Sequence, residues 1–137
     1  MAKRIFTCIM AGICVCSVYF LNKTPIFSGY AESYELYIAS ASSSAKIITV
    51  SEKIFPFVFN VKGQAITIDK KDFDLTAFLN EFNANIVTSD SFAYGIVYYA
   101  YSPKIKYKKK VGEHTVNLQI YLGEQVKIGS PIIFGSF

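Results

Sequence analysis

Lys104-Ile-Lys-Tyr-Lys-Lys-Lys-Val-Gly-Glu-His-Thr-Val-Asn-Leu-Gln-Ile-Tyr121 is the stretch of sequence that decides the fold. Apolar and polar residues alternate in it on both sides of Gly112-Glu113. A glycine followed by one residue between two alternating runs is typical of a β-hairpin, because glycine readily takes the positive φ that a type II′ turn requires. We therefore predict a β-hairpin with a two-residue loop. Its expected facing pairs are Val111 and His114, Lys108 and Asn117, Tyr107 and Leu118, Lys106 and Gln119, and Ile105 and Ile120.

This register gives the hairpin one apolar face and one basic face. The basic face carries Lys104, Lys106, Lys108 and Lys110, with Lys109 near the turn; residues 104–110 are called the lysine segment below. We expect it to be an electrostatic binding surface for an anionic membrane, a wall polymer or an acidic protein. Lysine offers point charges without the two-pronged geometry of arginine, so such binding would be weak and sensitive to salt. The alternative is that the lysines prevent an exposed strand from pairing with other chains.

The N-terminal region has the layout of an export signal. Lys3-Arg4 precede an uncharged apolar run from Ile5 to Leu21, which is typical of a secretory signal. The small residues Gly29 and Ala31 suit cleavage before Glu32; otherwise the run stays as a membrane anchor with its basic end inside. We expect residues 1–31 to be a signal peptide or an uncleaved anchor with its linker, and residues 32–137 to be a single exported domain. That domain would be extracellular or anchored to the outer face of the cytoplasmic membrane. A third interpretation is a buried core helix.

The positions of the cysteines and of the charged residues limit the kinds of site that the exported part can contain. All three cysteines, Cys8, Cys14 and Cys16, lie in the apolar run, so we expect no disulfide framework, thiol nucleophile or cysteine metal site after it. From Ala31 onward the chain has 11 Lys, no Arg and 10 Asp and Glu, which makes this part nearly neutral. The lysine segment is therefore its main concentration of positive charge.

Hydrophobic periodicity predicts the remaining elements. We expect strands at residues 34–39, 46–50, 57–61, 65–68, 85–89, 92–101 and 125–128, with residues 131–134 closing the domain. A hairpin is expected at Lys62-Gly63-Gln64 and a bend at Asp90-Ser91, and Gly95 marks a bulge or a close approach of two backbones.

One helix is predicted where Leu75, Phe78, Leu79 and Phe82 recur at helical spacing after a capping residue, Asp72 or Asp74. The expected fold is α+β: an antiparallel sheet with one main helix packed on one face, preceded by the N-terminal apolar segment.

Catalytic chemistry has little support in the sequence. His114 is the only histidine, and we expect it to be a solvated turn residue. The Asp72 and Asp74 pair is explained by the charge preference of a helix N-terminus. We expect no cofactor, no metal and no catalytic residue, and interpret the protein as a non-catalytic binding or accessory module of the cell envelope. The alternatives are an envelope hydrolase with a site unlike known motifs and a structural subunit acting through strand addition.

Three segments of the C-terminal third resemble a known family: Tyr99-Ala-Tyr-Ser-Pro103, Val116-Asn-Leu-Gln-Ile120 and Val126-Lys-Ile-Gly-Ser-Pro-Ile-Ile133. Their order and spacing are similar to those of the YwmB-like proteins, an exported group of Gram-positive bacteria, over roughly Tyr98 to Phe134. The resemblance implies a TATA-box-binding-protein-like fold, which is a curved antiparallel sheet backed by helix, and an unknown function. The name of that fold does not imply DNA binding, and we expect no nucleic-acid partner because no arginine follows Arg4.

Overall fold

The structure is a computed structural model that describes residues 1–40, 42 and 44–134, apart from the side chains of residues 20–22. Its elements, in chain order, are α1 (Ala2–Asn22), β1 (Ser33–Ile38), β2 (Lys46–Ser51), the 3-10 helix η1 (Phe55–Phe57), β3 (Val61–Ile68), the 3-10 helix η2 (Lys70–Asp72), α2 (Leu75–Glu81), β4 (Asn85–Phe92), β5 (Gly95–Tyr101), β6 (Lys109–Val111), β7 (His114–Val116), β8 (Leu118–Leu122) and β9 (Val126–Ser130).

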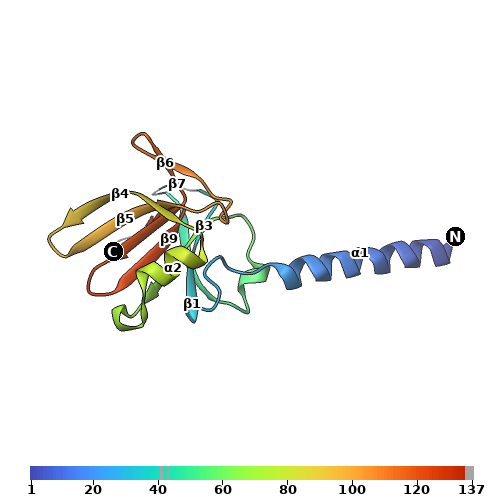
Figure 1. The fold of residues 1–137 in the computed structure, drawn as a ribbon. Helices are drawn as coiled ribbons and strands as arrows, with labels where there is room; N and C mark the ends of the chain where they lie inside the picture. The colour runs from blue at the N-terminus through green and yellow to red at the C-terminus, as the bar shows by residue number, and fades with distance from the viewer. Residues whose placement is uncertain (41, 43, 135–137) are drawn as a thin grey trace.

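Seven strands form one antiparallel sheet in the order β2-β1-β3-β9-β8-β5-β4, and β6 and β7 form a separate hairpin. Helix α2 covers one face of the large sheet, whereas α1 extends away from the domain as a rod (Figure 1). The expected α+β fold, with one main helix packed on one face of an antiparallel sheet, is confirmed.

The core lies between α2 and the sheet. The buried sheet residues that form it are Tyr34, Leu36, Ile66, Ile68, Ala100, Leu118, Ile120, Val126 and Ile128. From the helix side, Phe78 and Phe82 pack against them, as their spacing predicts. The expected cap is also present, because the side chain of Asp74 accepts a 3.0 Å hydrogen bond from the Ala77 amide. A helix this short is marginal alone, so these aromatic contacts stabilise it.

Residues after β9 cover part of the opposite face. The Ile133 amide donates to Gln119 Oε1 over 2.7 Å, and the Phe134 ring packs edge-on against Tyr37 with centroids 4.8 Å apart. Gly129 permits this return, because a Cβ there would lie 2.7 Å from the Ile133 side chain. Residues 131–134 therefore close the domain as expected, as an extended cover.

The predicted hairpin at Lys62-Gly63-Gln64 is wrong, because all three residues lie inside β3. The residues before them form η1 and a short irregular segment instead of a strand at 57–61. Gly63 allows the backbone at Ser130 to approach β3 closely, because a Cβ at this position would lie 2.7 Å from the Ser130 carbonyl oxygen. A glycine in a strand interior often marks such a close approach of another backbone.

The predicted bend at Asp90-Ser91 is also wrong. β4 runs through both residues to Phe92, and the chain turns at Ala93-Tyr94. Polar residues occur there because β4 is an edge strand that is exposed along nearly its whole length. The alternative of a close approach at Gly95 is confirmed, since a Cβ there would lie 2.5 Å from the Leu122 carbonyl oxygen.

Residues 24–31, which belong to the N-terminal segment expected to be a signal peptide or an anchor with its linker, pack onto the domain. Phe27 is 0% exposed, and its ring centroid lies 6.3 Å from that of Phe78 and 5.9 Å from that of Phe82. The Ile26 amide donates to Gln64 Oε1 over 2.7 Å, and the Tyr30 hydroxyl donates to Glu81. The segment between α1 and β1 is thus held by both the sheet and α2.

All described side chains of helix α1 are exposed. The window Ala2–Tyr19 is 0% buried and is apolar and long enough to cross a membrane, a test that a signal sequence also passes. The interpretation of this run as a buried core helix is therefore wrong.

Candidate binding surface: the lysine segment

The tip of the predicted basic hairpin has the expected register. Val111 lies opposite His114, and Lys110 and Lys109 lie opposite Thr115 and Val116. Gly112 has a φ of 59°, which is the positive value that the turn demands.

Beyond Lys109 the predicted pairing is wrong. Leu118 lies opposite Ala100, and Ile120 lies between Tyr98 and Ile128 of the large sheet. β8 therefore has two neighbours in the large sheet, β5 and β9, and residues 104–108 leave the hairpin as an irregular segment.

The lysine segment nevertheless keeps the predicted alternation. Ile105 is buried in the core, and Tyr107 is half-buried. The Tyr107 hydroxyl donates to the Val61 carbonyl over 3.3 Å, and burial raises the pKa of this phenol. Because alternate side chains point inward, the lysines between them point outward, and Lys104, Lys106, Lys108 and Lys110 are all exposed.

A buried polar network holds this irregular backbone in place. Asn117 is fully buried; its Oδ1 accepts from the Ser102 amide over 2.7 Å, and its Nδ2 donates to the carbonyls of Ser102 at 2.7 Å and Ile105 at 3.0 Å. The Ser102 hydroxyl donates to the Phe82 carbonyl and accepts from the Lys104 amide over 3.1 Å. A satisfied buried network of this kind fixes one backbone path. The predicted register placed Asn117 opposite Lys108 and gave it no such role, although a polar residue between Val116 and Leu118 is a signal of it.

The five lysines do not form one flat face. The ammonium of Lys104 donates to the Glu81 carbonyl over 2.6 Å, so it lies near the end of α2. Lys109 is half-buried, with its ammonium 4.9 Å from the centroid of the Phe134 ring. Lys104 and Lys106 thus belong to one part of the surface, and Lys109 and Lys110 to the small β6–β7 hairpin.

A pocket of about 710 Å³ joins the lysine segment to the end of α1. Its lining includes three cationic side chains, Lys23, Lys104 and Lys106, together with Tyr19 and Tyr107. The Lys23 ammonium donates to the Val58 carbonyl over 2.5 Å and lies 5.7 Å from the centroid of the Phe55 ring. Lys23 was not among the predicted binding residues, because only the fold brings it beside the lysine segment.

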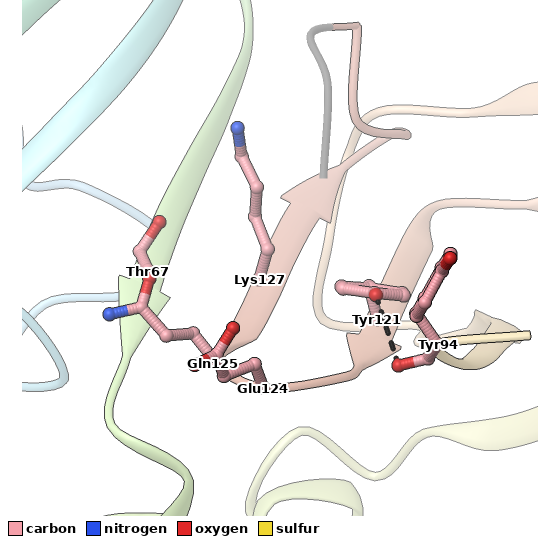
Figure 2. A pocket seen from close by; sticks show the side chains of 6 residues that line it. All are labelled: Thr67, Tyr94, Tyr121, Glu124, Gln125 and Lys127. Carbon is pink, nitrogen blue, oxygen red and sulfur yellow. Dashed lines mark hydrogen bonds between the residues drawn. The ribbon is translucent and has the colours of Figure 1, made fainter.

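A second pocket, of about 720 Å³, lies on the sheet face away from α2 and is lined by Thr67, Tyr94, Tyr121, Glu124, Gln125 and Lys127 (Figure 2). The Tyr121 hydroxyl donates to the Tyr94 carbonyl over 3.4 Å. Lys127 extends away from Glu124 in Figure 2 and forms an ion pair with Glu35, with 3.0 Å between nitrogen and oxygen. Two of the six lining side chains, Tyr121 and Lys127, are therefore already engaged by other groups of the domain.

The other titratable candidates lie apart. His114 is exposed at the β6–β7 turn, and Asp74 is occupied as the cap of α2. Among the described residues, no group of three or more His, Cys, Asp and Glu side chains is arranged to hold a metal ion.

Comparisons with known proteins return no relative. No family model matches the chain, and neither the curated proteins nor the solved structures contain a match. The resemblance of the C-terminal third to the YwmB-like proteins therefore stays a prediction.

Proposed function

We propose that the protein is an exported, membrane-anchored binding module of the cell envelope, non-catalytic, whose lysine segment holds anionic phospholipid head groups. The observation that supports this most directly is the pocket in which Lys23, Lys104 and Lys106 meet the end of α1. If α1 spans the membrane with Lys3-Arg4 inside, these three lysines lie at the outer surface of the bilayer.

Retention of α1 is supported by the packing of the segment that follows it. Cleavage before Glu32 would remove Phe27 from its place against Phe78 and Phe82. Truncating a buried phenylalanine costs about 3–5 kcal/mol, against a total stability of about 5–15 kcal/mol for an ordinary domain. An anchor that remains attached avoids this loss, so we favour the anchor over a signal peptide cleaved at Ala31.

Electrostatics favours head groups as the ligand of Lys104 and Lys106. A lysine close to an anionic membrane contributes about 1 kcal/mol of binding free energy, and the effect falls off within a Debye length of about 8–10 Å. Only lysines held near the bilayer gain from it. Lys104 and Lys106 lie beside the end of α1, and the Asn117 network holds their backbone there.

The test measures lipid that copurifies with the full chain. The chain is extracted in mild detergent from vesicles with equal amounts of phosphatidylglycerol and phosphatidylcholine, and the bound lipids are measured by mass spectrometry at low and high salt. We expect enrichment of phosphatidylglycerol at low salt, and its loss in the Lys104→Gln/Lys106→Gln variant. The matched control is Lys70→Gln/Lys71→Gln, which removes the same charge from exposed positions in η2.

Equal enrichment in the Lys104→Gln/Lys106→Gln variant and the native chain would refute the head-group assignment. Equal loss in both variants would show an effect of net charge only. If the full chain instead binds poly(glycerol phosphate) and loses this binding in Lys108→Gln/Lys110→Gln, the ligand is a wall polymer and the hairpin tip is its site.

A second candidate function, pairing with another chain by strand addition, is favoured by one observation. β4 is an edge strand of eight residues, and Ile86, Val87 and Phe92 expose large apolar side chains on it. Such an edge pairs readily with another strand. Light scattering of the detergent-solubilised chain tests this: a dimer that becomes a monomer in Val87→Lys would support it, and a monomeric native chain would refute it.

A further inference from the structure

An apolar patch protrudes around η1, at residues that the proposed electrostatic site does not use. Ile54, Phe57 and Phe59 are 52%, 65% and 63% exposed, while Phe55 between them is buried in the core. We call Ile54, Phe57 and Phe59 the η1 patch. The buried Phe55 fixes the turn, so these three large side chains are held outward within six consecutive residues. Single exposed apolar residues need no explanation, but a cluster of this kind marks a contact surface.

The η1 patch lies where α1 joins the domain. α1 contacts η1, and Lys23, one residue beyond α1, places its ammonium 5.5 Å from the centroid of the Phe59 ring. In Figure 1 the long helix meets the domain at this turn, whereas the β4–β5 turn lies at the opposite end of the molecule. Whatever surrounds α1 at its C-terminal end therefore also meets Phe57 and Phe59.

We propose that the η1 patch inserts into the interfacial layer of the same bilayer that α1 crosses. This inference rests on the proposed anchoring and adds a second membrane contact to it. Aromatic side chains favour the level of the lipid head groups, and apolar side chains flanked by lysines are typical of surfaces that lie in this layer. The flanking lysines are Lys23 and Lys53. The contact would hold the domain against the membrane in one orientation and bring Lys104 and Lys106 to the head groups.

The chain offers a clean optical test because it contains no tryptophan. Phe57→Trp places one probe in the η1 patch. Phe92→Trp is the matched control, since Phe92 is 55% exposed but lies at the β4–β5 turn. Ile13→Trp, in the middle of α1, reports insertion of the helix itself. Each full-length variant is reconstituted into vesicles of phosphatidylcholine, whose zwitterionic head groups minimise the electrostatic attraction of the lysines. A fraction of this lipid carries bromine near either the glycerol end or the methyl end of its acyl chains.

We expect Phe57→Trp emission to be blue-shifted relative to Phe92→Trp and to be quenched by bromine near the glycerol end. Ile13→Trp should be quenched more strongly by bromine near the methyl end, and Phe92→Trp by neither lipid. If Phe57→Trp does not fold, Phe59→Trp carries the same test.

The outcomes separate the two proposals. If Ile13→Trp is quenched but Phe57→Trp is quenched no more than Phe92→Trp, the η1 contact is overturned, because no orientation of the domain is then fixed. The anchor stays intact in that case. If Ile13→Trp is not quenched by either lipid, α1 does not insert, and the anchoring fails together with the inference that rests on it.

Discussion

Substitution of Phe27 by alanine measures whether residues 24–31 belong to the folded unit. Phe27 is 0% exposed and packs against the rings of Phe78 and Phe82, and the Tyr34 hydroxyl donates to its carbonyl over 3.4 Å. The substitution keeps the carbonyl and removes the ring, so it leaves a cavity between α2 and the sheet. A change of this type costs about 3–5 kcal/mol.

The matched control is Phe92→Ala, which removes the same atoms from a side chain that is 55% exposed. We expect it to change the free energy of unfolding by no more than about 0.5 kcal/mol. One kcal/mol corresponds to about 4–8 °C in the melting temperature of a domain of this size. The melting temperature of Phe27→Ala should therefore lie more than about 10 °C below that of Phe92→Ala, on the same scale of about 4–8 °C per kcal/mol.

The assay is urea and thermal unfolding of the full chain in detergent micelles, followed by near-ultraviolet circular dichroism of the tyrosines. Nine of the ten tyrosines lie after α1, so the signal reports the domain and not the helix. A loss below about 1 kcal/mol in Phe27→Ala, well under the usual cost of such a cavity, would refute the reasoning. The segment would then be dispensable for the fold, and cleavage at Ala31 would again be compatible with it.

Three further predictions concern the sheet and its network. Asn117→Ala leaves the Ser102 amide and the Ile105 carbonyl without a partner, and each unsatisfied group costs about 1–3 kcal/mol of stability. We therefore expect trypsin to cleave this variant faster after Lys104 and Lys106; an unchanged digestion rate would contradict the role of the network. Gly63→Ala should cost about 1–3 kcal/mol in urea unfolding, because its Cβ would lie 2.7 Å from a backbone oxygen; a neutral effect would contradict this close approach. Burial chiefly raises the pKa of Tyr37 from 10.0 to about 12, so its stabilising contribution is complete below pH 10 and is lost as pH rises through 12. Tyr37→Phe should reduce this alkaline loss of stability in pH-dependent unfolding, and an identical alkaline profile would contradict it.

The features that the sequence predicted correctly depend on local chemistry. Asp74 followed by apolar residues at helical spacing indicates a capped helix wherever the chain goes afterwards, and α2 is found there. Gly112 likewise determines the turn between β6 and β7, because its positive φ depends only on the four residues of the turn. The inward and outward alternation of the side chains of residues 104–108 was predicted correctly for the same reason, although the strand predicted to pair with them was wrong.

The features that were missed depend on what approaches from elsewhere in the chain. Gly63 looks like a turn residue in the sequence, but it is required where the backbone at Ser130 comes within van der Waals range. Phe27, between Pro25 and Gly29, has the composition of a linker and becomes core only because α2 and the sheet leave a space for it. Sequence periodicity carries no information on such distant neighbours, so the pocket formed by Lys23 and the lysine segment could not be predicted.

The arrangement of charge and apolar surface has a consequence for what the rest of the domain can contact. Lys23, the pocket of the lysine segment and the η1 patch all lie at the end of the molecule where α1 leaves it. Figure 1 shows the β4–β5 turn at the other end, and Tyr94 of that turn is 87% exposed. If α1 spans the membrane as proposed, the pocket beside Tyr94 and Tyr121 lies at the end of the domain that is distant from the bilayer. In that arrangement a soluble partner would reach this distal end and the β4 edge without competing with lipid, whereas a ligand of Lys104 and Lys106 would compete with it.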